Sequence, residues 1–133
     1  MVRQPKILIV EDDQDCCDAL SEVLALQGYD AMCVRDGGEA LAQLRREPFD
    51  VLVVDLGLSD VTGLDVIRAA RALPDAPAVV VFTGYHRLKA EAEAAGCDAF
   101  VLKPALEELL ACVGTSIAVR LAQSVTPARK GRG

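Results

Sequence analysis

Five short apolar runs alternate along the chain with longer segments whose apolar residues recur at helical spacing. The runs are rich in valine and isoleucine, as expected of strands that are buried on both faces. They cover residues 6–10, 30–34, 50–56, 76–84 and 98–104, and the helical segments cover about 14–27, 37–46, 64–72, 87–95 and 105–122. A strand followed by a helix, repeated five times, predicts an α/β protein with a five-stranded parallel sheet.

The connections between these strands predict the architecture. Right-handed crossovers place helices on both faces of a parallel sheet, which gives a doubly wound (βα)5 three-layer sandwich. The length of 133 residues suits one domain, which we assign to residues 1–122. Residues 123–133, which contain proline, glycine and basic side chains, are expected to form a basic flexible tail or linker.

Composition and charge exclude several classes of protein. A hydrophobic fraction of 52% excludes a disordered chain. No apolar run approaches the length of a membrane helix, and the N-terminus lacks the features of a signal peptide, so we expect a cytoplasmic protein. Residues 1–119 hold all 20 acidic residues and ten basic ones. Their net charge of −10 predicts that this domain binds neither nucleic acid nor a membrane directly.

The cysteines do not form a recognisable metal or disulfide pattern. Their number is odd, and no CxxC motif is present; they are Cys16, Cys17, Cys33, Cys97 and Cys112. We expect them to be reduced and mostly buried, acting as small hydrophobic residues of a cytoplasmic protein.

Chemically active side chains follow four of the five predicted strands. Glu11, Asp12 and Asp13 follow the first strand, and Asp55, Thr83 and Lys103 follow or end the third, fourth and fifth. The carboxyl ends of parallel strands meet at one edge of the sheet, where ligands bind in such folds. Several carboxylates at one site need a counter-charge, and oxygen ligands suit Mg²⁺.

This combination predicts phosphoryl chemistry. Asp55 would be the nucleophile, the metal and Lys103 would offset charge on the phosphoryl oxygens, and Thr83 would donate a hydrogen bond to one of them. Taken singly, each residue has a plainer explanation, such as a helix N-cap at Asp13 or Asp15. Their occurrence at four strand ends favours a functional site.

Four segments resemble the receiver (CheY-like) domain of two-component response regulators. They are ILIVEDD (7–13), VLVVDLGLSDVTGLDVI (51–67), VVVFTG (79–84) and AFVLKP (99–104), and the resemblance covers about residues 5–122. It implies a flavodoxin-like sheet in the order 2-1-3-4-5. It also implies phosphorelay signalling, in which a histidine kinase or histidine phosphotransfer protein phosphorylates an aspartate and thereby switches a protein-interaction face. Such a domain is not an enzyme; it catalyses only its own phosphorylation and dephosphorylation.

The resemblance also implies individual roles. Asp55 matches the phospho-acceptor, and Lys103 matches the lysine that contacts the phosphate and precedes an often cis Pro104. Thr83 and Phe100 match the switch residues. The implied Mg²⁺ ligands are Glu11 (mostly through water), Asp12, Asp55 and the backbone carbonyl of Gly57.

Some positions depart from the commonest family pattern. Ser59 replaces a usual proline, so the loop around it is expected to be more mobile. Phe100 lacks the hydroxyl of tyrosine, so switching there must depend on packing. Gly84 leaves the phosphoryl group open to water, whereas Tyr85 is placed to cover it.

Three other functions compete with this interpretation. A haloacid-dehalogenase-like phosphatase would need a DxD motif after the first strand, and a flavodoxin-type module would need a phosphate loop there in place of three acids. A receiver-like interaction module that works without phosphorylation normally lacks one of the residues present here. The effector is expected either beyond the C-terminus or in a separate target protein.

Overall fold

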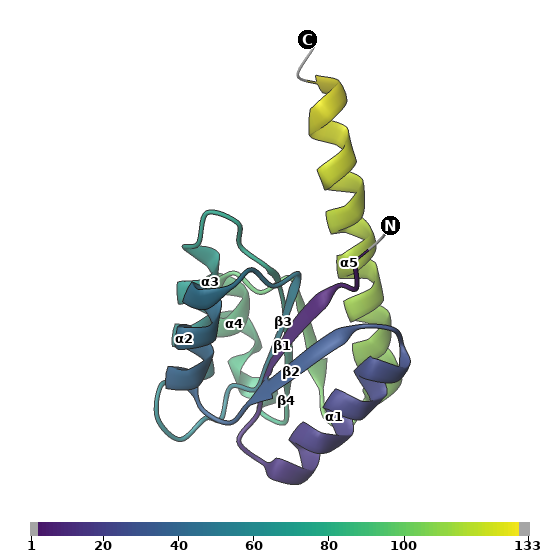
Figure 1. Cartoon of the computed structure of the whole chain (residues 1–133). Coiled ribbons are helices and arrows are strands. Elements are labelled where there is room, and N and C mark those ends of the chain that lie inside the picture. The colour runs from purple at the N-terminus through teal and green to yellow at the C-terminus, as the bar shows by residue number, and fades with distance from the viewer. Residues whose placement is uncertain (1–2, 131–133) are drawn as a thin grey trace.

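The computed structural model describes the backbone of residues 3–130 and side chains as far as residue 123. It contains one five-stranded parallel sheet with the strand order β2-β1-β3-β4-β5 (Figure 1), which confirms the predicted doubly wound α/β fold. The strands are β1 (Lys6–Val10), β2 (Asp30–Val34), β3 (Val51–Val54), β4 (Ala78–Thr83) and β5 (Ala99–Leu102). The helices are α1 (Gln14–Leu26), α2 (Gly37–Arg46), α3 (Gly63–Arg71), the 3₁₀ turn η1 (His86–Leu88), α4 (Lys89–Ala95) and α5 (Leu106–Lys130).

Two apolar cores cover the two faces of the sheet. Because side chains alternate along a strand, Ile7 and Ile9 of β1 face one core, while Leu8 and Val10 face the other. Helices α1 and α5 cover the first core and α2, α3 and α4 cover the second (Figure 1). This two-sided burial explains why the central strands read as continuous apolar runs.

Several element ends differ from the sequence prediction. Strands β3, β4 and β5 are shorter than their apolar runs, although the amides of Asp50, Asp55 and Lys103, just outside them, still donate to carbonyls of the neighbouring strands. The predicted fourth helix divides into η1 and α4. Helix α5 continues to Lys130, past residue 122: no glycine or proline interrupts residues 115–126, and Pro127 does not end the helix. Of the two candidate caps for α1, Asp13 is the N-cap and accepts a hydrogen bond from the Cys16 amide.

The expectation that all five cysteines are reduced is wrong for one pair. Cys17 in α1 and Cys33 in β2 form a disulfide bond, with their Cα atoms 5.9 Å apart. This separation lies within the usual range for disulfides, and it arises from the packing of α1 on β2, which residue spacing alone does not reveal. Cys16, Cys97 and Cys112 are free and half-buried. Burial raises the pKa of all three thiols, that of Cys16 to about 11.

An ion-pair cluster holds α5 at the amino edge of the sheet. Arg120 donates a hydrogen bond to the Ala76 carbonyl at 2.8 Å and lies 3.7 Å from Asp50 and 3.6 Å from Asp75. Asp50 also accepts hydrogen bonds from the Arg3 side chain and the Lys6 amide. Burial raises the pKa of Asp50, but these hydrogen bonds and the charges of Arg3 and Arg120 outweigh it, so the pKa is lowered. Among the described residues, no helix is long and apolar enough to cross a membrane.

Candidate functional site

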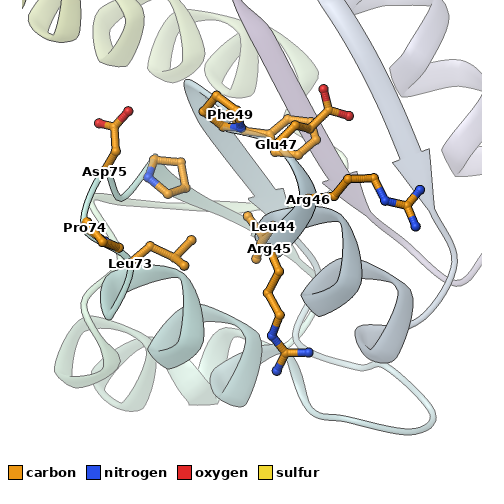
Figure 2. Close-up of a pocket in the computed structure, with 10 residues that line it drawn as sticks. Leu44, Arg45, Arg46, Glu47, Phe49, Leu73, Pro74 and Asp75 are labelled. Atoms are coloured by element: carbon orange, nitrogen blue, oxygen red, sulfur yellow. The ribbon is translucent and has the colours of Figure 1, made fainter.

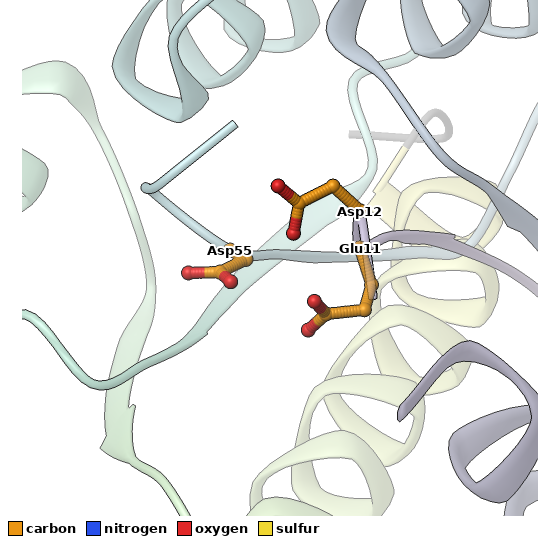
Figure 3. Close-up of side chains that lie close together, drawn as sticks. All are labelled: Glu11, Asp12 and Asp55. Atoms are coloured by element: carbon orange, nitrogen blue, oxygen red, sulfur yellow. The ribbon is translucent and has the colours of Figure 1, made fainter. Parts of the chain in front are cut away.

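Three carboxylates meet at the carboxyl edge of the sheet. Val10 and Val54 are paired at the ends of β1 and β3, so Glu11 and Asp55 follow at the same level, and the Asp55 amide donates to the Val10 carbonyl at 3.0 Å. One oxygen each of Glu11, Asp12 and Asp55 lies within 4.8 Å of the others (Figure 3). Glu11 is 2% exposed and Asp55 8%, whereas Asp12 is half-buried.

Lys103 is the cation of this cluster. Its Nζ lies 2.6 Å from Glu11 Oε1 and 3.1 Å from Asp55 Oδ2. Burial opposes its charge, but the hydrogen bonds and charges of the two carboxylates outweigh burial, so the pKa of Lys103 is raised well above its usual value. Lys103 therefore stays charged and offsets part of the negative charge of the site.

The other Asp55 oxygen is also partnered. Thr83 is fully buried, and its Oγ1 donates to Asp55 Oδ1 at 2.8 Å. The Gly57 amide approaches the same oxygen at 3.3 Å. The structure thus brings together the side chains that the sequence placed at the ends of four separate strands.

The donor set fits a hard divalent cation. It consists of three carboxylates from two adjacent strand ends, and Mg²⁺ prefers a few carboxylate oxygens and retains several waters. Their negative charge exceeds the single positive charge of Lys103, so a cation is favoured there. The use of the Gly57 carbonyl as a further ligand stays a prediction.

One contact near the site was not predicted from the sequence. Asp60, in the loop after β3, accepts hydrogen bonds from the amides of Gly37 and Gly38 at 2.9 and 3.0 Å. These bonds lower the pKa of Asp60 and attach the loop to the N-terminus of α2. The loop that contains Ser59, which we expected to be mobile, is thus anchored by Asp60. The paired glycines were a signal for close backbone approach, although they did not reveal the partner.

The remaining predicted residues lie around this centre. Tyr85 is 56% exposed, and its ring lies over Gly57, where an added Cβ would be 2.4 Å from the Tyr85 Cε2. Phe100 is half-buried and packs against the core beneath α2, α3 and α4. The peptide bond between Lys103 and Pro104 is cis, as predicted.

A hollow lies away from the carboxylates. A cavity of about 420 Å³ is formed where α2 and α3 end, at the opposite edge of the sheet (Figure 2). Leu44, Phe49 and Leu73 line it, with Arg45 near its rim. It contains none of the residues predicted for phosphoryl chemistry.

The fold is that of CheY-like proteins. A CheY-like response regulator receiver domain protein from Methanospirillum hungatei has a similar structure, with a TM-score of 0.86 and 27% identity over 91% of this chain and 99% of that one. For the chemotaxis response regulator CheY4 of Vibrio cholerae the TM-score is 0.80 and the identity 27%, over 86% and 99% of the two chains. Residues 7–113 match the response regulator receiver domain, and the chain belongs to this family.

Longer relatives show the same relationship. The sensory transduction protein RegX3 of Mycolicibacterium smegmatis is 35% identical over 107 residues, and the transcriptional regulatory protein KdpE of Mycobacterium tuberculosis is 34% identical over 107. Each match covers 79% of this chain and 47% of the relative, so the chain spans about half the length of these relatives. The chain contains a signalling domain of two-component systems, which argues against the phosphatase and flavodoxin interpretations.

Proposed function

We propose that Asp55 accepts a phosphoryl group from a histidine kinase or histidine phosphotransfer protein in a Mg²⁺-dependent reaction. One observation carries this proposal: the two oxygens of a single buried carboxylate contact a hydroxyl donor, Thr83, and a fixed cation, Lys103. These are the groups that a phosphoryl oxygen would need beside its acceptor. Family membership supports the same conclusion.

The reaction follows from these contacts. An Asp55 oxygen attacks phosphorus, the phosphorus–nitrogen bond to the donor imidazole breaks, and the imidazole retains the electron pair. Lys103 is positioned to pair with a phosphoryl oxygen as its contact with Asp55 is lost. A bound Mg²⁺ would offset charge on the phosphoryl oxygens, and Glu11, Asp12, Asp55 and the Gly57 carbonyl would hold it.

Thr83 would begin the conformational response. Its hydroxyl donates to Asp55 in this structure, so it must exchange that acceptor for a phosphoryl oxygen. Because one charge-assisted hydrogen bond replaces another, only the difference in free energy between the two bonds biases the conformational equilibrium. Phe100 would follow by repacking, and the face of α4, β5 and α5 would change. Leu102 and Leu106, 43% and 38% exposed, lie on these elements.

The domain would act in the cytoplasm by contacting other proteins, without direct binding of nucleic acid or membrane. Its effector would be a domain beyond the C-terminus or a separate target. It would not turn over a separate substrate, since the chemistry ends on its own carboxylate.

Acetyl phosphate and Mg²⁺ test the proposal. Intact-mass spectrometry should show one added phosphate that is labile in base and is absent when the metal is chelated. An Asp55→Asn protein that is labelled as well as the wild type would place the acceptor elsewhere. A folded wild-type protein that is never labelled would favour the phosphorylation-independent interaction module.

A further inference from the structure

We propose that Cys17 and Cys33 form a reversible thiol–disulfide site whose oxidation state sets the metal affinity of the neighbouring carboxylates. Their bond joins the N-terminal part of α1 to the edge strand β2 and closes a loop across 16 positions of sequence. In a reducing compartment, a disulfide of this kind is usually transient and redox-sensing. The exchange chemistry goes beyond the proposed function, while its effect on metal binding rests on that function.

Both ends of the disulfide border Glu11. The Sγ of Cys17 lies 3.7 Å from the Glu11 carbonyl oxygen. On the other side, the Glu11 amide donates at 3.0 Å to the carbonyl of Val34, the residue after Cys33. The Glu11 side chain in turn contacts Lys103 and accepts from the Asp13 amide. The disulfide bond therefore lies next to the segment that carries Glu11 and Asp12.

Accessibility determines where exchange begins. Cys17 is 3% exposed, whereas Cys33 is half-buried on an edge strand that pairs with β1 alone. A thiolate from solution would attack the Cys33 sulfur, because access controls which sulfur is attacked. The Cys17–Cys33 bond breaks, Cys17 leaves as a thiolate and takes up a proton, and a mixed disulfide remains on Cys33. A second thiolate attacks the outer sulfur, releases Cys33 and forms the oxidised small disulfide, so two electrons pass to the protein.

The oxidised form holds the acidic segment at both ends. Asp12 lies between β1, which is fixed in the sheet, and α1, which the disulfide fixes to β2. Fixing ligands before binding lowers the ordering cost of binding. We therefore expect oxidation to lower the Kd for Mg²⁺ by roughly fivefold, at the lower end of couplings between protein sites.

The first experiment identifies the bond without reference to function. The full chain is equilibrated with reduced and oxidised glutathione at several ratios, quenched by alkylation and mapped by peptide mass spectrometry. The expected result is a 17–33 linkage that appears and disappears reversibly, while Cys97 is alkylated throughout. Five alkylated thiols at every ratio, or a linkage that involves Cys16, would overturn the site.

The second experiment measures the coupling. Mg²⁺ is titrated into the oxidised and reduced protein while amide shifts are followed by NMR. Wild type and the control Cys97→Ser should show the fivefold difference, whereas Cys33→Ser and Cys17→Ala should bind Mg²⁺ equally under both conditions. Equal Mg²⁺ affinity of the two wild-type forms would overturn the coupling. If neither form binds Mg²⁺, both the coupling and the proposed metal site are wrong, while a mapped 17–33 bond would still support the exchange site.

Discussion

Replacing Lys103 by methionine should separate metal binding from phosphorylation. The substitution keeps an unbranched side chain and removes the positive charge that lies 2.6 Å from Glu11 and 3.1 Å from Asp55. Three carboxylates would then share one site without their cation. Two unit charges at the 4.8 Å limit of this cluster repel by about 3.5 kcal/mol at an effective dielectric constant of about 20.

Mg²⁺ would relieve that repulsion, and it would no longer be repelled by the ammonium group. A dication a few ångströms from an ammonium group experiences several kcal/mol of gross repulsion at the same dielectric constant. Most of this is offset by solvent and by relaxation of the partly exposed lysine. We expect a net gain of about 1.4 kcal/mol, which corresponds to a Kd for Mg²⁺ about tenfold lower.

The same variant should be phosphorylated slowly. It lacks the charge that would stabilise the phosphoryl oxygens, and loss of one such group typically reduces rates by about a hundredfold. NMR titration gives the Mg²⁺ affinity, and mass spectrometry with acetyl phosphate gives the labelling rate. Lys89→Met, which removes the same charge from an exposed position on α4, is the control and should resemble wild type. Weaker Mg²⁺ binding by Lys103→Met, or labelling at the wild-type rate, would refute this account of the lysine.

Three further predictions concern the surroundings of the site. Gly63→Ala should destabilise the fold by about 1–3 kcal/mol in urea unfolding, because the added Cβ would lie 2.4 Å from the backbone oxygen of Asp55. Gly84→Ala is the control and should be nearly neutral, since the space around Gly84 is open. Asp60→Ala should weaken Mg²⁺ binding several-fold in the same titration, because the loop loses its two bonds to α2; unchanged binding would show that the anchor is irrelevant to the site. The lowered pKa of Asp50 means that its stabilising contribution is present above about pH 4 and is lost as pH falls through its folded-state pKa. Asp50→Asn should therefore reduce the loss of thermal stability between pH 5 and 3. If thermal stability depends on pH in the variant as it does in the wild type, this role of Asp50 is contradicted.

The sequence was sufficient to predict the fold and the centre of the site. Parallel strands bring their carboxyl ends to one edge, so the residues after Val10 and Val54 had to be neighbours once the strands were identified. The disulfide and the Asp60 anchor were not predictable in this way. Each depends on how a helix packs against a strand or a loop, and periodicity gives the buried face of a helix without giving its position along the sheet. The end of α5 was misplaced for another reason, since the proline, glycine and basic residues of 123–133 were taken for a flexible tail, whereas the helix continues to Lys130.

Arg120 divides α5 into a part that packs on the sheet and a part that extends beyond it. Its earlier turns rest on the sheet, and beyond Arg120 it projects past the body of the domain (Figure 1). At 1.5 Å per residue, the segment from Arg120 to Lys130 is about 15 Å long. The contacts of Arg120 with Ala76, Asp50 and Asp75 therefore set the direction in which this segment leaves the domain.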